Sequence, residues 1–245
     1  LGILFSILTV GLVVVIPILS YRYKRRSLIA KMKDIQWFRD IPMDGNLVAS
    51  EYVLKEAYLS KNTNTLASAL ILKMIYEGYL NVNKDAGGKI EISFNDEKFD
   101  ELDGAEGKLY RMMREASGSD LILQDNEFSR WSRRHTTSVA NWADSIKSEG
   151  RSKLQTKGYV SSNGKFSEVG KAKARELVGF KKYLDEFTLV SEKETAEVGL
   201  WQDYLIFASL FGIADKVAKQ LKDINPQAFE QTMVYDYTTM RSILY

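Results

Sequence analysis

The sequence predicts a mainly α-helical protein with small β-hairpins, built as a transmembrane helix, tandem winged-helix-like domains and a C-terminal helical segment. Three observations lead to this fold class. The chain opens with an uncharged apolar run, a pattern of helices followed by a hairpin then occurs twice, and another apolar stretch lies near the C-terminus. The expected segments are residues 1–33, 34–103, 104–175 and 176–245.

Residues 1–21 form the predicted transmembrane helix. The first 20 residues contain no Asp, Glu, Lys or Arg, and about 20 helical residues cross a hydrocarbon core of roughly 30 Å. The basic residues that anchor its end are Arg22, Lys24, Arg25 and Arg26. This flank predicts a cell-membrane protein, single-pass in this chain, with its N-terminus outside and the bulk of the chain in the cytoplasm.

A secretory signal peptide is the competing interpretation of the opening run. Such a peptide carries its positive charges before the apolar residues and a small-residue cleavage site after them, and neither is present. The chain begins with Leu1, inside the apolar run. We therefore expect a piece of a longer protein with an extracytoplasmic part upstream.

The first unit combines two helices with a hairpin. Asp44-Gly45-Asn46 is a turn and capping pattern, and Gly78 ends the second apolar periodicity. The expected elements are helices over 47–59 and 66–77 and strands over 79–82 and 89–94. This order is typical of a winged helix, although a generic α+β unit would show the same pattern.

The second unit repeats this plan. Its expected elements are helices over 109–116, 128–134 and 139–155, a strand over 121–123 and a short wing over 161–167. The junction Gly158-Tyr159-Val160 echoes Gly78-Tyr79-Leu80 at the equivalent place in the first unit. Two such junctions favour tandem winged helices, but the repeat is short.

The C-terminal segment carries an apolar run over residues 200–214, after a long helix predicted over 170–187. Asp203 interrupts the run, and Asp215 and Lys216 close it, so it is too short between charges for a membrane span. We predict a buried or interfacial helix. Its packing or bilayer-contacting residues are Trp201, Tyr204, Leu205 and Phe211.

The sequence offers no catalytic, cofactor or metal site. It has no cysteine and a single histidine, His135, so neither a Cys/His metal site nor a thiol nucleophile is available. Glycine-rich phosphate loops and the Gly-x-Ser-x-Gly elbow are absent. The acidic cluster over 95–103 lacks EF-hand spacing, which favours a polar linker. We predict a non-enzymatic protein without cofactors and a solvated His135.

Charge separates the two units. Residues 34–120 carry 10 Lys/Arg and 16 Asp/Glu, whereas residues 126–182 carry 13 and 5. The candidate basic interaction surface comprises Arg130, Arg133, Arg134, Lys147, Arg151, Lys153 and Lys157. Such a surface suits an anionic bilayer, the acidic first unit or the C-terminal segment of the same chain, an acidic partner protein, or DNA phosphates.

The favoured hypothesis is a membrane-anchored interaction or scaffold module whose partners are the lipid bilayer and a membrane or cell-envelope protein. The alternative is a membrane-tethered DNA-binding regulator that uses the basic second unit. The first unit is the poorer DNA-binding candidate, because its predicted second helix carries only Lys73 as a basic residue. The sequence leaves the partner and the oligomeric state open.

The chain also resembles a family of uncharacterised, predicted bacterial membrane proteins. The motifs that carry this resemblance are Glu77-Gly-Tyr-Leu80, Thr156-Lys-Gly-Tyr-Val160, Gly179-Phe-Lys-Lys-Tyr-Leu184, Leu200-Trp-Gln-Asp-Tyr-Leu-Ile-Phe-Ala208 and Gly212-Ile-Ala-Asp-Lys-Val217. The resemblance implies an extracytoplasmic N-terminal domain, a membrane helix, a cytoplasmic tandem winged-helix-like region and hydrophobic segments near the C-terminus. It implies no catalytic residue and no ligand.

Overall fold

The computed structural model describes residues 16–20, 35–60, 64–124, 126–186 and 195–232. Most of the predicted membrane anchor, including the basic flank at residues 22–26, lies outside these residues. In the described part of the chain, no helix is both long enough and apolar enough to cross a bilayer. This part is mainly helical and contains a three-stranded antiparallel sheet, which agrees with the predicted mainly α class.

The elements follow one another closely along the chain. In order they are η2 (Pro42–Gly45), α2 (Leu47–Glu56), α3 (Asn64–Tyr76), β1 (Leu80–Lys84), β2 (Ile90–Phe94), η3 (Asp96–Glu101), α4 (Gly104–Ala116), β3 (Ile122–Leu123), α5 (Glu127–Arg134), α6 (Thr136–Thr156), α7 (Glu168–Glu186), η5 (Thr195–Leu200), α8 (Trp201–Phe211), α9 (Ala214–Ile224) and α10 (Pro226–Thr232).

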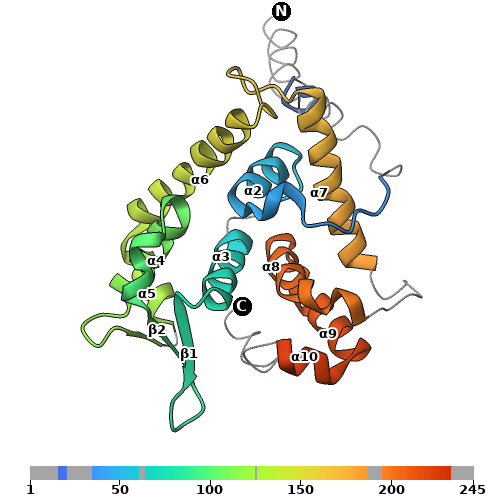
Figure 1. The fold of residues 1–245 in the computed structure, drawn as a ribbon. Helices are drawn as coiled ribbons and strands as arrows, with labels where there is room; N and C mark the ends of the chain where they lie inside the picture. The colour runs from blue at the N-terminus through green and yellow to red at the C-terminus, as the bar shows by residue number, and fades with distance from the viewer. Residues whose placement is uncertain (1–15, 21–34, 61–63, 125, 187–194, 233–245) are drawn as a thin grey trace, which may run out of the picture.

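Helix α2 lies at the centre of the molecule. In Figure 1, α6 runs along one side of it with α4 and α5 at its far end, and α7 runs along the other side. Helix α3 packs against α8, and α9 and α10 continue from α8. Residues 47–54 of α2 are all buried, which is expected of a helix surrounded by other elements.

The contact between α2 and α6 depends on a glycine. Every fourth residue of α6 from Trp142 is buried, which places Trp142, Ile146, Gly150 and Leu154 on one face. A Cβ added at Gly150 would lie 2.7 Å from the carbonyl oxygen of Val48 and 2.8 Å from Cβ of Tyr52. Glycine therefore allows the two backbones to approach this closely.

A second packing layer joins α7 and α8 through aromatic rings. Phe180 of α7 makes edge-on contacts with Tyr204 and Phe207 of α8, with ring centroids 5.7 and 5.5 Å apart. Gly179 lets the chain at residues 36–38 cross over α7, since a Cβ there would lie 2.6 Å from the carbonyl oxygen of Gln36. The N-terminal and C-terminal parts of the described chain thus share one core.

The sheet joins the two predicted units. Strands β1 and β2 pair from Leu80 with Phe94 to Lys84 with Ile90. Strand β3, predicted for the second unit, pairs with β2 of the first unit through Ile92 with Leu123. The second unit retains one isolated bridge, between Val160 and Phe166, at its predicted wing.

The two Gly-Tyr junctions have the same geometry. Gly78 and Gly158 both adopt left-handed φ values, +75° and +70°, at the ends of α3 and α6. In each junction the tyrosine N–H donates back to the last turn of its helix, from Tyr79 to Met74 O and from Tyr159 to Leu154 O. A glycine in this conformation is a common helix C-cap. The two similar sequence motifs therefore form the same capping structure.

Element boundaries differ from the predictions by a few residues. Asn46 caps α2 as predicted, and its Oδ1 accepts from the Ala49 N–H at 2.8 Å. However, α2 ends at Glu56 rather than residue 59, because Tyr58 takes a left-handed φ of 57°. Helix α6 begins at Thr136, three residues before the predicted start.

We predict that Gly150→Ala destabilises the fold. The added methyl group forces α2 and α6 apart, which costs about 1–3 kcal/mol and outweighs the roughly 1 kcal/mol gain in helix propensity. Urea unfolding of the detergent-solubilised chain measures this change. Ser148→Ala, at an exposed site on α6, is the control and should change stability by less than about 0.5 kcal/mol. A more stable Gly150→Ala protein would contradict the close approach.

Candidate functional site

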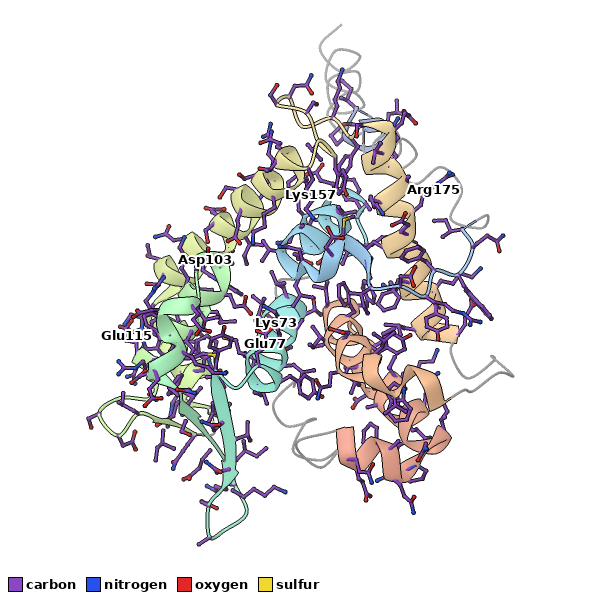
Figure 2. All side chains as sticks on the ribbon, in the orientation of Figure 1. Lys73, Glu77, Asp103, Glu115, Lys157 and Arg175 are labelled. Carbon is purple, nitrogen blue, oxygen red and sulfur yellow. The ribbon has the colours of Figure 1, made fainter. Side chains whose placement is uncertain are left out.

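The predicted basic surface is divided between the two ends of α6. Arg151, Lys153 and Lys157 lie at its C-terminal end beside α2, whereas the three arginines of α5 lie beyond its N-terminal end. Measured from Thr136, Arg151 and Lys157 lie 15 and 21 residues along α6, which corresponds to about 22 and 31 Å of helix. Figure 2 shows the separation, with Lys157 labelled near α2 and Glu115 labelled in the α4–α5 region.

Intramolecular partners occupy the basic residues at the C-terminal end. Lys157 pairs with Asp44, and Lys153 lies 3.1 Å from Glu149. The Arg151 guanidinium donates to the carbonyl oxygen of Ser162 in the wing. The hydrogen bond from Lys157 lowers the pKa of Asp44 and raises that of Lys157. These cations therefore hold the wing and the start of α2 against α6.

An apolar hollow of about 210 Å³ lies beside these pairs. Its lining residues are Met43, Asn46, Ala49, Lys153, Leu154, Thr156, Lys157 and Tyr159. The turn that forms one wall is unusual, because Met43 and Asp44 both have left-handed φ values, 56° and 52°. Non-glycine residues adopt this conformation at an energetic cost, and the pair between Asp44 and Lys157 fastens the turn to α6.

A polar hollow of about 230 Å³ adjoins the apolar one and contains a half-buried ion pair. The Lys73 ammonium lies 2.9 Å from both carboxylate oxygens of Glu106, and Glu77, just after the end of α3, lies 3.4 Å away. Figure 2 labels Lys73 on α3 and Glu77 at its end, with Asp103 at the start of α4. Glu149, on another wall, accepts from the Ala105 N–H at 2.7 Å and so caps α4.

Burial is the largest single influence on the pKa of each partner in this pair. It raises the pKa of Glu106, although Lys73 opposes the shift. Burial also tends to lower the pKa of Lys73, but hydrogen bonds to Glu106 and the charges of Glu106 and Glu77 outweigh it, so that this pKa is raised. The carboxylate is thus held in the hollow at a cost that its cation offsets only in part.

A third hollow, of about 340 Å³, lies on α5 and is called here the α5 hollow. Its lining residues are Ala116, Glu127, Arg130, Trp131, Arg134 and His135. Trp131 is stacked between Phe128 and His135, with ring centroids 6.0 and 4.3 Å away. Arg130 approaches Glu127 only to 3.9 Å, and Arg134 has no hydrogen-bond or ion-pair partner within the described part of the chain.

The side chain of His135, predicted to be solvated, is only partly exposed. Its side chain is 41% exposed, but one ring face lies on Trp131. Its Nδ1 lies 2.9 Å from Trp131 O, and its Nε2 lies 4.0 Å from Glu115. The spacing of Phe128, Trp131 and His135 by three and four residues is the sequence signal that could have found this stack.

The remaining predicted residues have different environments. Arg133 is exposed and donates to Ser129 at 3.1 Å, and Lys147 is exposed on α6. The four residues of the predicted packing helix, Trp201, Tyr204, Leu205 and Phe211, are all buried. Helix α8 therefore lies within the core. No group of three or more His, Cys, Asp or Glu side chains that could hold a metal occurs among the residues described.

Comparison with known protein families gives a match to the C-terminal part of the chain. Residues 164–221 match the model of a family described as "Predicted membrane protein (DUF2207) C-terminal domain". This segment begins in the wing and includes α7 and α8, so it contains the core aromatic layer but neither group of basic residues. A search of curated proteins found no match, and a search of solved structures also found none.

We predict that Lys73→Met destabilises the fold by about 1–2 kcal/mol at neutral pH, because it leaves the Glu106 carboxylate half-buried without its cation. The loss should shrink as pH falls toward 5. The folded-state pKa of Glu106 is raised, so its favourable contribution is present at low pH and disappears as pH rises through that pKa. Urea unfolding across this pH range measures the effect.

A matched double variant separates charge from packing. Lys73→Met with Glu106→Gln removes both charges and should recover most of the loss at neutral pH. A deficit in Lys73→Met that is the same at pH 5 and pH 7 would indicate lost packing of the lysine stem instead.

Proposed function

We propose that this chain is a non-enzymatic protein-interaction module tethered to the membrane. Support for the membrane part comes from the uncharged opening run, its basic flank and the predicted-membrane-protein family matched by residues 164–221. We infer a topology with the N-terminus outside and residues 34–245 in the cytoplasm. The partner is a membrane or cell-envelope protein.

We infer two winged-helix-like units, at residues 34–103 and 104–175. The equivalent glycine-tyrosine junctions support this interpretation, since each joins a long helix to a strand or bridge residue. The order α4, β3, α5, α6 and wing in the second unit also supports it. Strand β3 adds to the hairpin of the first unit, so the units share one sheet.

The observation that carries the functional proposal is that α3 is covered by another helix and that the cations near the C-terminal end of α6 already have partners within the chain. Helix α3 is covered by α8 and buries six of its residues. Helix α6 lies on α2 along one face, and the cations near its C-terminal end bind Asp44, Glu149 and the wing. A recognition helix instead needs a face and cations that are free for the groove.

The alternative, DNA binding, has one observation in its favour. Arg130, Arg133 and Arg134 are exposed on α5, the helix before α6, and they belong to the segment rich in positive charge. In a winged helix this position can contact the phosphate backbone. Contacts to the DNA phosphates alone, without contacts from a helix to the bases, would give binding that depends strongly on salt and not on DNA sequence.

We predict that crosslinking in cells recovers a specific membrane or envelope protein. A photo-reactive residue at Thr156, which lines the apolar hollow, should capture it, because apolar hollows accept the anchoring side chains of partners. The same residue at Ser148, exposed elsewhere on α6, is the control. Identical recovery from both positions would contradict the proposal.

We also predict that the detergent-solubilised chain forms no sequence-preferring complex with duplex DNA in an electrophoretic shift assay. The DNA-binding alternative predicts a complex that weakens steeply with salt and is lost in the Arg133→Gln, Arg134→Gln double variant. Arg151→Ala with Lys153→Ala tests the other end of α6. A discrete complex with one sequence that survives physiological salt would favour the alternative.

A further inference from the structure

We propose that the α5 hollow is a binding site for a phosphomonoester group, such as free phosphate or the terminal phosphate of a small metabolite. The proposal does not rest on the interaction function, because its evidence is confined to the lining of this hollow. Its volume, about 340 Å³, falls within the range of small-molecule sites and exceeds what one phosphate needs.

The guanidinium groups are the first reason for this assignment. Arg130 and Arg134 are one helical turn apart and line the same hollow. Arg130 has only a distant contact with Glu127, and Arg134 is unpaired within the described residues. Elsewhere, Lys73, Lys153 and Lys157 each have a close carboxylate. Two guanidiniums with spare donors are suited to an oxyanion.

The indole of Trp131 is the second reason. The side chain lines the hollow and is 8% exposed, yet its Nε1 has no hydrogen-bond partner among the residues described. A buried donor left unpaired costs about 1–3 kcal/mol. The Nε1 atom is covered in this conformation, so an oxyanion held by the neighbouring arginines would become its acceptor only after the covering atoms move. The Phe128 and His135 rings fix the indole plane.

The charges around the hollow favour a dianion. Glu127 also lines it, but its Oε2 accepts from the Gln124 N–H at 2.9 Å, next to the start of α5. Glu115 does not line the hollow, and its Oε1 lies 4.0 Å from His135 Nε2. The hollow is lined by two guanidiniums and one carboxylate, so its net charge is positive. A bound group with two negative charges is attracted more strongly to this lining than a group with one. A phosphomonoester has close to two charges at neutral pH and three terminal oxygens, whereas a phosphodiester has one charge.

The experiment follows the indole N–H resonances of the full chain in detergent, labelled with ¹⁵N-tryptophan. The chain has four tryptophans, and Trp131→Phe assigns the resonance of interest. The indole N–H groups of Trp37 and Trp142 already donate to Glu186 and Ala105 O, so they are internal controls. The probes are inorganic phosphate, methyl phosphate, dimethyl phosphate and adenosine monophosphate.

We expect saturable shifts of the Trp131 resonance with inorganic and methyl phosphate, and weaker or no shifts with dimethyl phosphate. Arg134→Gln and Arg130→Gln should each weaken binding about tenfold, since each removes a charge-assisted contact. Arg133→Gln, on the same helix but outside the hollow, should not. Glu127→Gln should strengthen binding. Tighter binding of adenosine monophosphate would identify a nucleotide as the source of the phosphate, and equal binding would identify the phosphate alone.

Two outcomes would overturn the proposal. One is a Trp131 resonance that stays unchanged throughout the phosphate titration, or that shifts only together with the control indoles. The other is equal weakening by Arg133→Gln and Arg134→Gln, which would reduce the effect to the general positive charge of α5. Tighter binding of dimethyl phosphate than of methyl phosphate would likewise count against a phosphomonoester site.

Discussion

The close approach of α2 and α6 is the constraint on which the rest of the structure depends. Gly150 allows the two backbones to touch, and α6 then sets the positions of α4, α5 and the wing. Helix α2 lies against α3 on another side, and α3 lies against α8. Because interiors are close-packed, the separation of α2 and α6 also shapes the hollows at their junction.

Several charged side chains of this protein form ion pairs with one another. The acidic first unit and the basic second unit carry net charges of opposite sign, and Lys157 of the second unit pairs with Asp44 of the first. Exposed pairs of this kind contribute little to stability individually. The pairs of Lys153 and Lys157 offset part of the positive charge at the C-terminal end of α6, whereas Arg134 on α5 has no partner among the described residues.

The sequence predicted local features well, because they depend on neighbouring residues. Asn46 as a helix cap and the matching turns at Gly78 and Gly158 are determined by backbone chemistry within a few positions. It did not predict that β3 pairs with β2, or that the hollow at Trp131 forms, because both depend on packing between distant segments. Net charge identified a basic region, but only the fold shows which cations remain unpaired.

The pairing of β3 with β2 makes the two units dependent on each other. A chain that ended after the first unit, at residue 103, would expose the edge of β2 that Ile122 and Leu123 normally cover. An unpaired strand edge can pair with a strand of another chain. By pairing with β2, the short strand β3 blocks this route to self-association. In a nascent chain, this edge of β2 stays unpaired until residue 123 has been synthesised, and an unpaired strand edge is open to association with other chains during that interval.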